Sequence, residues 1–442
     1  MLQAYRRCKV ISIFSSQKIK FHIIHNYTSL NKGWASIVLS TVESIKKTIP
    51  NAEFTIESYH PNIDKKLYER YGIKVLERLT YSKTIAINMF LRALFWRIWS
   101  KHAPSTRRFL ESKRLAIYYD SDVILDLAGD NLSVPSDDQN MFFRIQRNFL
   151  AIIGHIYLFL LCMLLKKTIV IYGQTIGPLG ILRPVVKMLL NKMNLITVRE
   201  ENSLRYLEKI GVSKPPIYLT ADPAFLLSTP PVAEISKILQ TEGVNAEKPV
   251  IGMCISSETA KYHFRDGEQK FIELLVTTID DLVAKYNSQV VLIPFSTWKG
   301  HGGDDRIISQ KIYALTKRKE GIKLIKGEYN PIELKGIISR CNIFIGSRGH
   351  SCILALSSCV PTIAIGHNPK YYGIMKMVGQ EHYVCKAQEL TYDRLISLIC
   401  RLWSDQETVK RQLRSKIRLV QRLATLNAEL VKNKLQERNF VN

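Results

Sequence analysis

The sequence lacks the residue spacings that mark common metal, nucleotide and nucleic-acid sites. No two cysteines form a C-x-x-C pair, and no cysteine has a histidine at zinc-ligand spacing. No segment fits G-x-G-x-x-G or a Walker loop, and no RRM-like aromatic motif is present. These absences argue against a zinc module, a P-loop enzyme and a nucleic-acid partner, and we expect no cofactor.

Long hydrophobic runs are also scarce. The run from Phe149 to Leu165 is apolar for 17 residues, which is the lower limit for spanning a bilayer. Because it carries His155 and leads directly into a strand, a buried core helix is favoured. The first residues, MLQAYRRCKVISIF, hold an apolar patch too short for a secretory signal.

The eight cysteines are scattered along the chain. Several, such as Cys254 and Cys352, lie within apolar runs, as small buried hydrophobic residues do in a reducing compartment. The sequence therefore predicts a cytoplasmic protein, with peripheral contact at the inner face of the membrane as a further option.

Acidic residues are few compared with basic ones. The chain has 63 Lys and Arg against 38 Asp and Glu, a formal net charge of +25. This excess favours acidic partners such as an anionic membrane or a phosphorylated substrate. Much of it lies between Arg401 and Arg438, where basic and apolar residues alternate. That pattern indicates either a solvated helix face or a helix on a membrane surface.

What is present is a repeated alternation of strands and helices. Such alternation predicts parallel sheets covered by helices on both faces, and 442 residues exceed the size of one ordinary core. Residues 228 to 249 hold three prolines and many polar side chains, as a domain boundary does. We predict two Rossmann-like lobes, residues 18–228 and 248–400, with a cleft between them and a basic helical tail, 401–442.

In open α/β sheets the ligand lies beyond the carboxyl ends of the strands. The strand that stops at Gly346 is followed by Ser347, Arg348, Gly349 and His350, at the predicted start of a helix. A helix N-terminus attracts an anion, an arginine suits bidentate binding of phosphate or carboxylate, and a histidine can transfer protons. We therefore expect an anion site here, although both side chains also suit a simple turn.

Other strand ends carry polar residues too. Arg199 follows the strand LITV and would face the same cleft from the other lobe, unless Glu200 or Glu201 holds it. The remaining strand-end candidates are Gln174 and Thr175, Asp222, and the cluster of His367, Asn368 and Lys370. Asp304 and Asp305 form a single carboxylate pair, which is poor evidence for a metal site.

Taken in order, these segments resemble the polysaccharide pyruvyl transferase family. The resemblance runs from about residue 20 to 385. It is carried by the following motifs: Asn31-x-Gly33, DVILDLAGDN, GQTIGPL, VREENS, ADPAF, and GSRGH followed by ALSSCVPTIAIG and a lysine.

The resemblance implies two lobes of glycosyltransferase-B type, phosphoenolpyruvate as donor, and a sugar diol of a glycan or lipid-linked glycan as acceptor. Arg199 and the triplet Arg348, Gly349 and His350 would then hold the donor, together with Lys370. His350 would be the proton or phosphate partner, with Asp222 and Asp126 as orienting groups. Candidates for the acceptor side or the cleft are Asn31, Gln174, Thr175 and His367.

Three positions depart from the family pattern: Trp34 after the Asn31 motif, Phe295 after LIP, and Gly349. Gly349 would loosen the donor loop, and Phe295 would remove a catalytic or acceptor contact. Two other functions fit the same architecture: a glycosyltransferase with a nucleotide-sugar donor, and a basic membrane-associated binding protein with a degenerate site.

Overall fold

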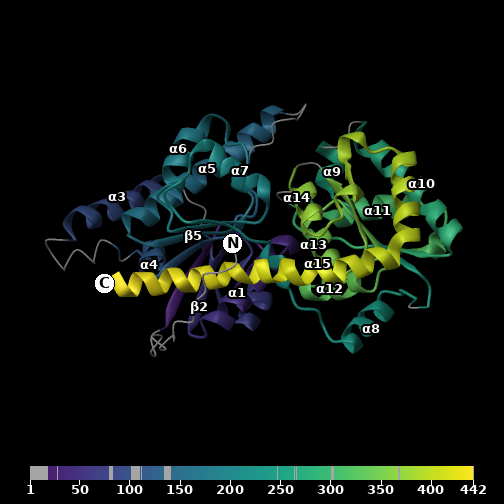
Figure 1. Ribbon diagram of the computed structural model, residues 1–442, viewed down its shortest axis with the longest axis horizontal. Coiled ribbons are helices and arrows are strands. Elements are labelled where there is room, and N and C mark those ends of the chain that lie inside the picture. The colour runs from purple at the N-terminus through teal and green to yellow at the C-terminus, as the bar shows by residue number, and fades with distance from the viewer. Residues whose placement is uncertain are drawn as a thin grey trace.

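The computed structural model shows two parallel α/β lobes joined by a long final helix (Figure 1). It describes residues 18–26, 28–78, 83–100, 110, 112–133, 141–245, 247–262, 264, 266–299, 303–366 and 369–441. The prediction of two lobes with parallel sheets is confirmed.

The N-terminal lobe is built on a seven-stranded sheet of order β3-β2-β1-β4-β5-β6-β7. Its strands are β1 (Ile19–Ile24), β2 (Ala52–Ser58), β3 (Ile73–Glu77), β4 (Val123–Asp126), β5 (Thr168–Gln174), β6 (Leu195–Val198) and β7 (Ile217–Leu219). The strand order reverses between β1 and β4, so this is where ligands of such sheets bind.

The C-terminal lobe has a six-stranded sheet of order β10-β9-β8-β11-β12-β13. Its strands are β8 (Val250–Cys254), β9 (Gln289–Leu292), β10 (Ile322–Leu324), β11 (Ile343–Gly346), β12 (Thr362–Gly366) and β13 (Val384–Lys386). Here the reversal lies between β8 and β11, directly before the Arg348 turn.

Helices connect the strands of each lobe. Those of the N-terminal lobe are α1 (Lys32–Thr48), α2 (Pro61–Tyr68), α3 (Lys83–Trp99), α4 (Lys113–Asp120), α5 (Met141–Leu164), α6 (Arg183–Leu190) and α7 (Glu201–Ile210). The later ones are α8 (Val232–Thr241), α9 (Ser257–Tyr262), α10 (Gly267–Tyr286), α11 (Asp305–Leu315), α12 (Pro331–Ser339), α13 (Gly349–Ser357), α14 (Pro369–Met377) and α15 (Tyr392–Val441).

The segment between the sheets is more ordered than its composition indicates. Helix α8 occupies part of the expected boundary, residues 228 to 249, and packs against α12. Ile235, Ile238 and Leu239 are buried. Their spacing of three and four residues places them on one face of a helix, and burial of that face outweighs the polar composition around it.

The basic tail is part of one continuous helix. Helix α15 begins at Tyr392 rather than at Arg401 and runs from the C-terminal lobe back across the N-terminal lobe (Figure 1). Leu413, Ile417 and Val420 are buried against the protein. The tail therefore has little apolar surface left for a membrane. Its exposed side carries Arg411, Arg414, Arg418 and Arg422, as the interpretation of a solvated helix face expects.

Helix α5 contains the apolar run from residue 149 to 165. Leu158, Phe159, Leu161 and Cys162 are buried in the core of the N-terminal lobe, so the prediction of a buried helix is confirmed for these side chains. Within the described ranges, no helix combines the length and apolar character needed to cross a membrane.

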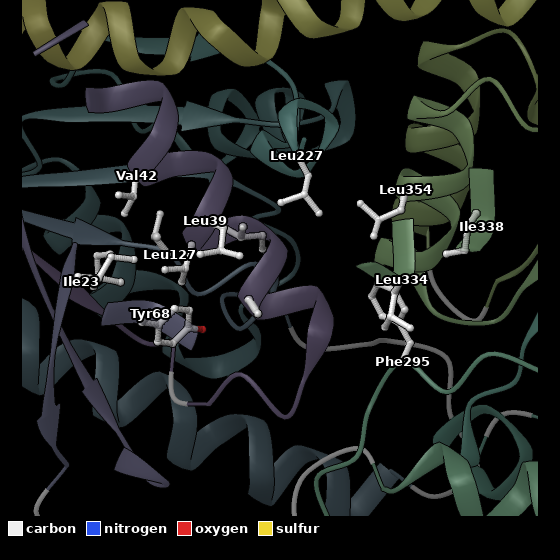
Figure 2. Close-up of a cluster of buried hydrophobic side chains, with 14 of the residues drawn as sticks. Ile23, Leu39, Val42, Tyr68, Leu127, Leu227, Phe295, Leu334, Ile338 and Leu354 are labelled. Atoms are coloured by element: carbon white, nitrogen blue, oxygen red, sulfur yellow. The ribbon is translucent and has the colours of Figure 1, made fainter. Parts of the chain in front are cut away.

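A single hydrophobic cluster extends across both lobes (Figure 2). Leu39 of α1 comes from the first lobe, whereas Phe295, Leu334 of α12 and Leu354 of α13 come from the second. An apolar interface of this kind restricts relative motion of the lobes where it lies. Phe295 is fully buried in this cluster, so its side chain serves packing rather than a ligand contact.

Asn427 of α15 ties the last helix to the first lobe. Its side-chain oxygen accepts hydrogen bonds from Thr197 Oγ1 at 2.5 Å and Thr220 Oγ1 at 2.9 Å, and its amide donates to the Ala221 carbonyl at 3.0 Å. All of these groups are buried.

We expect Asn427→Ala to lower the free energy of unfolding by about 1–3 kcal/mol, because it leaves buried hydroxyl and carbonyl groups without partners. The control is Asn433→Ala, the same change at an exposed position of α15. Urea unfolding followed by circular dichroism measures both, and equal midpoints would contradict this role for Asn427.

Candidate active site between the lobes

Arg199 lies at the carboxyl end of β6 and is almost completely buried. Its Nη1 donates to Asp222 Oδ2 at 2.5 Å, and its Nε donates to Thr175 Oγ1 at 2.9 Å. Three strand ends of the N-terminal lobe thus converge through one guanidinium group. Glu200 does not hold Arg199, because its carboxylate caps α7 instead.

Asp222 links Arg199 to the second lobe. His350 Nε2 lies 3.5 Å from Asp222 Oδ2, an ion-pair distance longer than a well-formed hydrogen bond. Burial alone would raise the pKa of Asp222, but Arg199 and His350 outweigh it and hold the pKa well below its ordinary value. Asp222 is therefore ionised at any physiological pH, and it orients the Arg199 guanidinium group and faces the His350 ring.

The closeness of His350 explains why residue 33, two positions after Asn31, is a glycine. A Cβ atom at Gly33 would lie 2.6 Å from His350 Nδ1, so the histidine ring packs directly on the start of α1. Asn31 caps that helix through its side-chain oxygen, which accepts from the Gly33 and Trp34 amides at 3.0 and 3.3 Å. The predicted cleft residue Asn31 thus shapes the helix start that supports His350.

A second cross-lobe pair joins Lys370 Nζ of α14 to Asp130 Oδ2, just after β4. Burial would raise the pKa of Asp130, but Lys370, Arg199 and His350 together hold it well below its ordinary value. Asp130 is 35% exposed and Lys370 15%, whereas Arg199 and Asp222 are 1% exposed. A solute entering the site would therefore meet the Lys370 pair first.

Arg348 occupies the strand-end turn as expected, but its charge is directed into its own lobe. Its Nη2 donates to Asp305 Oδ1 at 2.7 Å and its Nε to Asp305 Oδ2 at 3.2 Å, while Glu258 Oε2 lies 3.7 Å from Nη1. Although burial opposes it, Asp305 raises the pKa of Arg348. Arg348 thus fixes the turn that presents His350.

Gly349 is the first residue of α13, and Arg348 is its N-cap residue without a side-chain cap. A Cβ atom at Gly349 would make only an ordinary contact, 3.5 Å from Lys370 Cε. Helix α13 packs against α1, so two helix N-termini meet beside His350. Their partial positive charges add to those of Arg199 and Lys370.

Asp126 lies in a different environment, at the switch point of the first sheet. Its Oδ1 is 3.0 Å from His25 Nδ1, and its Oδ2 is 3.9 Å from His155 Nε2. Gln174 donates to the Asp126 backbone carbonyl at 2.6 Å, which makes this glutamine a link between β4 and β5. Burial raises the pKa of Asp126 despite the neighbouring histidine.

Within the described part of the chain, the side chains of His25, Asp126 and His155 form the group that could bind a metal ion. The rings of His25 and His155 stack at 3.4 Å between centroids, with 19° between their planes. Because imidazole nitrogens bind metals in the plane of the ring, stacked rings would have to turn before both could ligate one ion. Asp304, the other acidic candidate, caps α11 and binds Arg306.

The structure thus brings Arg199, Thr175, Asp222, His350 and Lys370 together at the lobe boundary, with Gly349 beside them. Sequence reasoning missed Asp130 as a site residue, although it lies in the turn after a strand end, where such residues were sought. It also missed the pairing of Arg348 with Asp305, which no sequence spacing reveals. His367 and Asn368 lie outside the described residues.

Comparisons with known proteins agree with this architecture. The chain is 25% identical over 259 residues to the amylovoran biosynthesis protein AmsJ of Erwinia amylovora, a match that covers 57% of this chain and 62% of that protein. The chain thus spans under two thirds of that relative.

Among solved structures, the S. aureus MnaA–UDP complex has a TM-score of 0.57 at 14% identity, covering 96% of this chain and 98% of that one. A glycosyltransferase from Rickettsia africae has a TM-score of 0.56 at 13% identity, covering 95% and 99%. At these identities the likeness shows the fold alone, which is the expected glycosyltransferase-B type.

The family model described as polysaccharide pyruvyl transferase matches residues 31–369, well over half of the chain. That range includes the helix start at Asn31, the Arg199 strand end, the Arg348 turn and the beginning of α14. The chain therefore belongs to the polysaccharide pyruvyl transferase family.

Proposed function

We propose that this transferase moves pyruvate from phosphoenolpyruvate onto a sugar diol of a polysaccharide or lipid-linked glycan, forming a ketal and releasing phosphate. The observation that carries the proposal is the cluster of Arg199, His350 and Lys370 at the lobe boundary, beside two helix N-termini. Phosphoenolpyruvate carries a phosphate and a carboxylate, and such a cluster suits a small ligand with two anionic groups.

The cluster is electrically balanced as it stands, because Asp222 matches Arg199 and Asp130 matches Lys370. A donor anion must therefore take Lys370 from Asp130. We assign the phosphate to Lys370 and the α13 N-terminus, since these groups lie nearest to solvent. Arg199 binds Asp222 and so orients the carboxylate that faces His350. Arg348 fixes the turn that presents His350.

The reaction requires transfer of one proton to the donor and addition of two sugar hydroxyl groups to it. A proton is added to the methylene carbon of the enol, the first sugar hydroxyl adds to the neighbouring carbon, and phosphate leaves that carbon. The second hydroxyl then adds to the same carbon and closes the ring. Of the two protons that the hydroxyls release, one balances the proton added to the methylene carbon and the other leaves with phosphate, so one donor and one diol give one ketal and one phosphate. We assign the proton transfer to His350, held by Asp222 on one ring edge and by Gly33 on the other.

We place the reaction in the cytoplasm, with the enzyme in peripheral contact with an anionic membrane. The seven cysteines in the described part of the chain are free, five of them buried, which fits a reducing compartment. We propose that the reaction uses no metal ion and no other cofactor.

Calorimetry with phosphoenolpyruvate and a panel of nucleotide sugars tests the donor. We expect phosphoenolpyruvate to bind and nucleotide sugars not to bind. A protein that binds a nucleotide sugar and ignores phosphoenolpyruvate would be a glycosyltransferase with a different donor.

Lys370→Met should weaken phosphoenolpyruvate binding about tenfold or more, because a charge-assisted hydrogen bond to the ligand is lost. The control is Lys376→Met on the same helix, at a half-exposed position that also pairs across the lobes, with Glu201. Equal affinities of both variants in the same calorimetric titration would rule out Lys370 as a donor ligand.

Asp130→Asn should have the opposite effect. It removes the internal carboxylate that competes for Lys370, so phosphoenolpyruvate should bind several-fold more tightly. Asp120→Asn, an exposed change shortly before β4, is the control. Unchanged or weaker binding by Asp130→Asn would show that Asp130 does not compete with the donor.

Gly33→Ala should lower kcat for phosphate release by roughly tenfold to a hundredfold, because the new methyl group displaces the His350 ring. Gly154→Ala on α5, where a Cβ atom has no neighbour within 4 Å, is the control. Full activity of Gly33→Ala, measured as phosphate release with a glycan acceptor, would exclude this position of His350 during catalysis.

A further inference from the structure

Helix α3 is apolar on the side that faces solvent. Its inner side packs into the core of the N-terminal lobe through Met89 and Ala93, which are buried. Its outer side carries five large apolar side chains that are 46–58% exposed: Ile87, Leu91, Phe95, Ile98 and Trp99. Surface helices of soluble proteins normally place charged and polar residues there, so this exposure calls for a partner.

The five residues form one stripe. At about 100° per residue, spacings of four, four, three and one residues keep them within about a third of the helix circumference. Phe95 and Trp99 stack on each other with ring centroids 5.4 Å apart. Figure 1 shows α3 at the outer end of the N-terminal lobe, on the side away from the other lobe.

The charge of the helix indicates the kind of partner. Residues 83 to 99 contain no aspartate or glutamate and three basic residues, Lys83, Arg92 and Arg97. Arg97 is exposed, and Arg92 is partly exposed on the other side of the stripe. An apolar stripe with aromatic rings and flanking arginines is the pattern of a helix that lies in the headgroup region of an anionic bilayer.

A second copy of the chain fits this surface less well. Self-association through α3 would bring two arginine-flanked stripes together in a protein whose formal net charge is +25. An anionic lipid surface complements that charge, whereas a like-charged partner opposes it. Nor does α15 offer an alternative, because its apolar side is buried against both lobes.

We infer that the exposed stripe of α3 docks the protein onto an anionic phospholipid surface, with Leu91 and Phe95 at the centre of the contact. This inference names the surface for the membrane contact in the proposed function, but it rests on the exposure and charge of α3 and not on the donor. Membrane contact is therefore assigned to α3 and not to the basic tail.

The test is sedimentation of the full chain with phosphatidylcholine vesicles, with and without phosphatidylglycerol. We expect wild type to bind the anionic vesicles, and the double variant Leu91→Glu, Phe95→Glu to bind at least about tenfold more weakly. The control Ile307→Glu, Leu315→Glu makes the same change at two exposed apolar positions of α11 in the other lobe, and it should bind as wild type does.

Because all four positions are exposed, both double variants should fold, and circular dichroism verifies this. Failure of wild type to bind anionic vesicles, or equal loss in the two double variants, would overturn the inference. So would a wild-type dimer that the α3 variant dissociates without any vesicle binding, since that outcome assigns the stripe to a second copy. Phosphoenolpyruvate affinity of the α3 variant, expected to be unchanged, separates this test from that of the donor.

Discussion

The buried ion pair between Arg199 and Asp222 is the interaction on which the arrangement between the lobes depends. Both groups are excluded from water, so each would be costly without the other. The Asp222 carboxylate also faces His350, which belongs to the second lobe. A single buried aspartate therefore fixes where a strand end of one lobe meets a helix start of the other.

Around this pair the two lobes meet through contacts of different kinds. The cluster that includes Leu39 and Phe295 joins them through apolar packing, which resists sliding and separation alike (Figure 2). Lys370 and Asp130 join them through a partly exposed ion pair, which an incoming anion can exchange. Access to the proposed donor position therefore depends on the polar contacts, while the apolar cluster acts as the fixed side of the boundary.

Much of the fold was predictable from the sequence, because local pattern and tertiary burial agree in most of it. In α12 (Pro331–Ser339), for example, the asparagine cap and the proline that mark the helix start are sequence signals that the folded structure uses. The sequence did not predict helix α8, because prolines and polar residues surround its three apolar positions. The burial of these positions is seen only in the folded structure. At the site, strand ends located Arg199, Asp222, His350 and Lys370. Their partners could not be read from the sequence, since Asp130 and Lys370, like Arg348 and Asp305, are distant in the chain and meet only after folding.

The path of α15 links completion of the first lobe to a segment far along the chain. The hydroxyls of Thr197 and Thr220, in and just after the last two strands of the first sheet, donate hydrogen bonds to Asn427, which lies 230 and 207 residues further along the chain. During synthesis this edge of the first lobe stays incomplete until α15 has emerged and packed against it. The stability of the N-terminal lobe thus includes a contribution from a helix that begins in the C-terminal lobe.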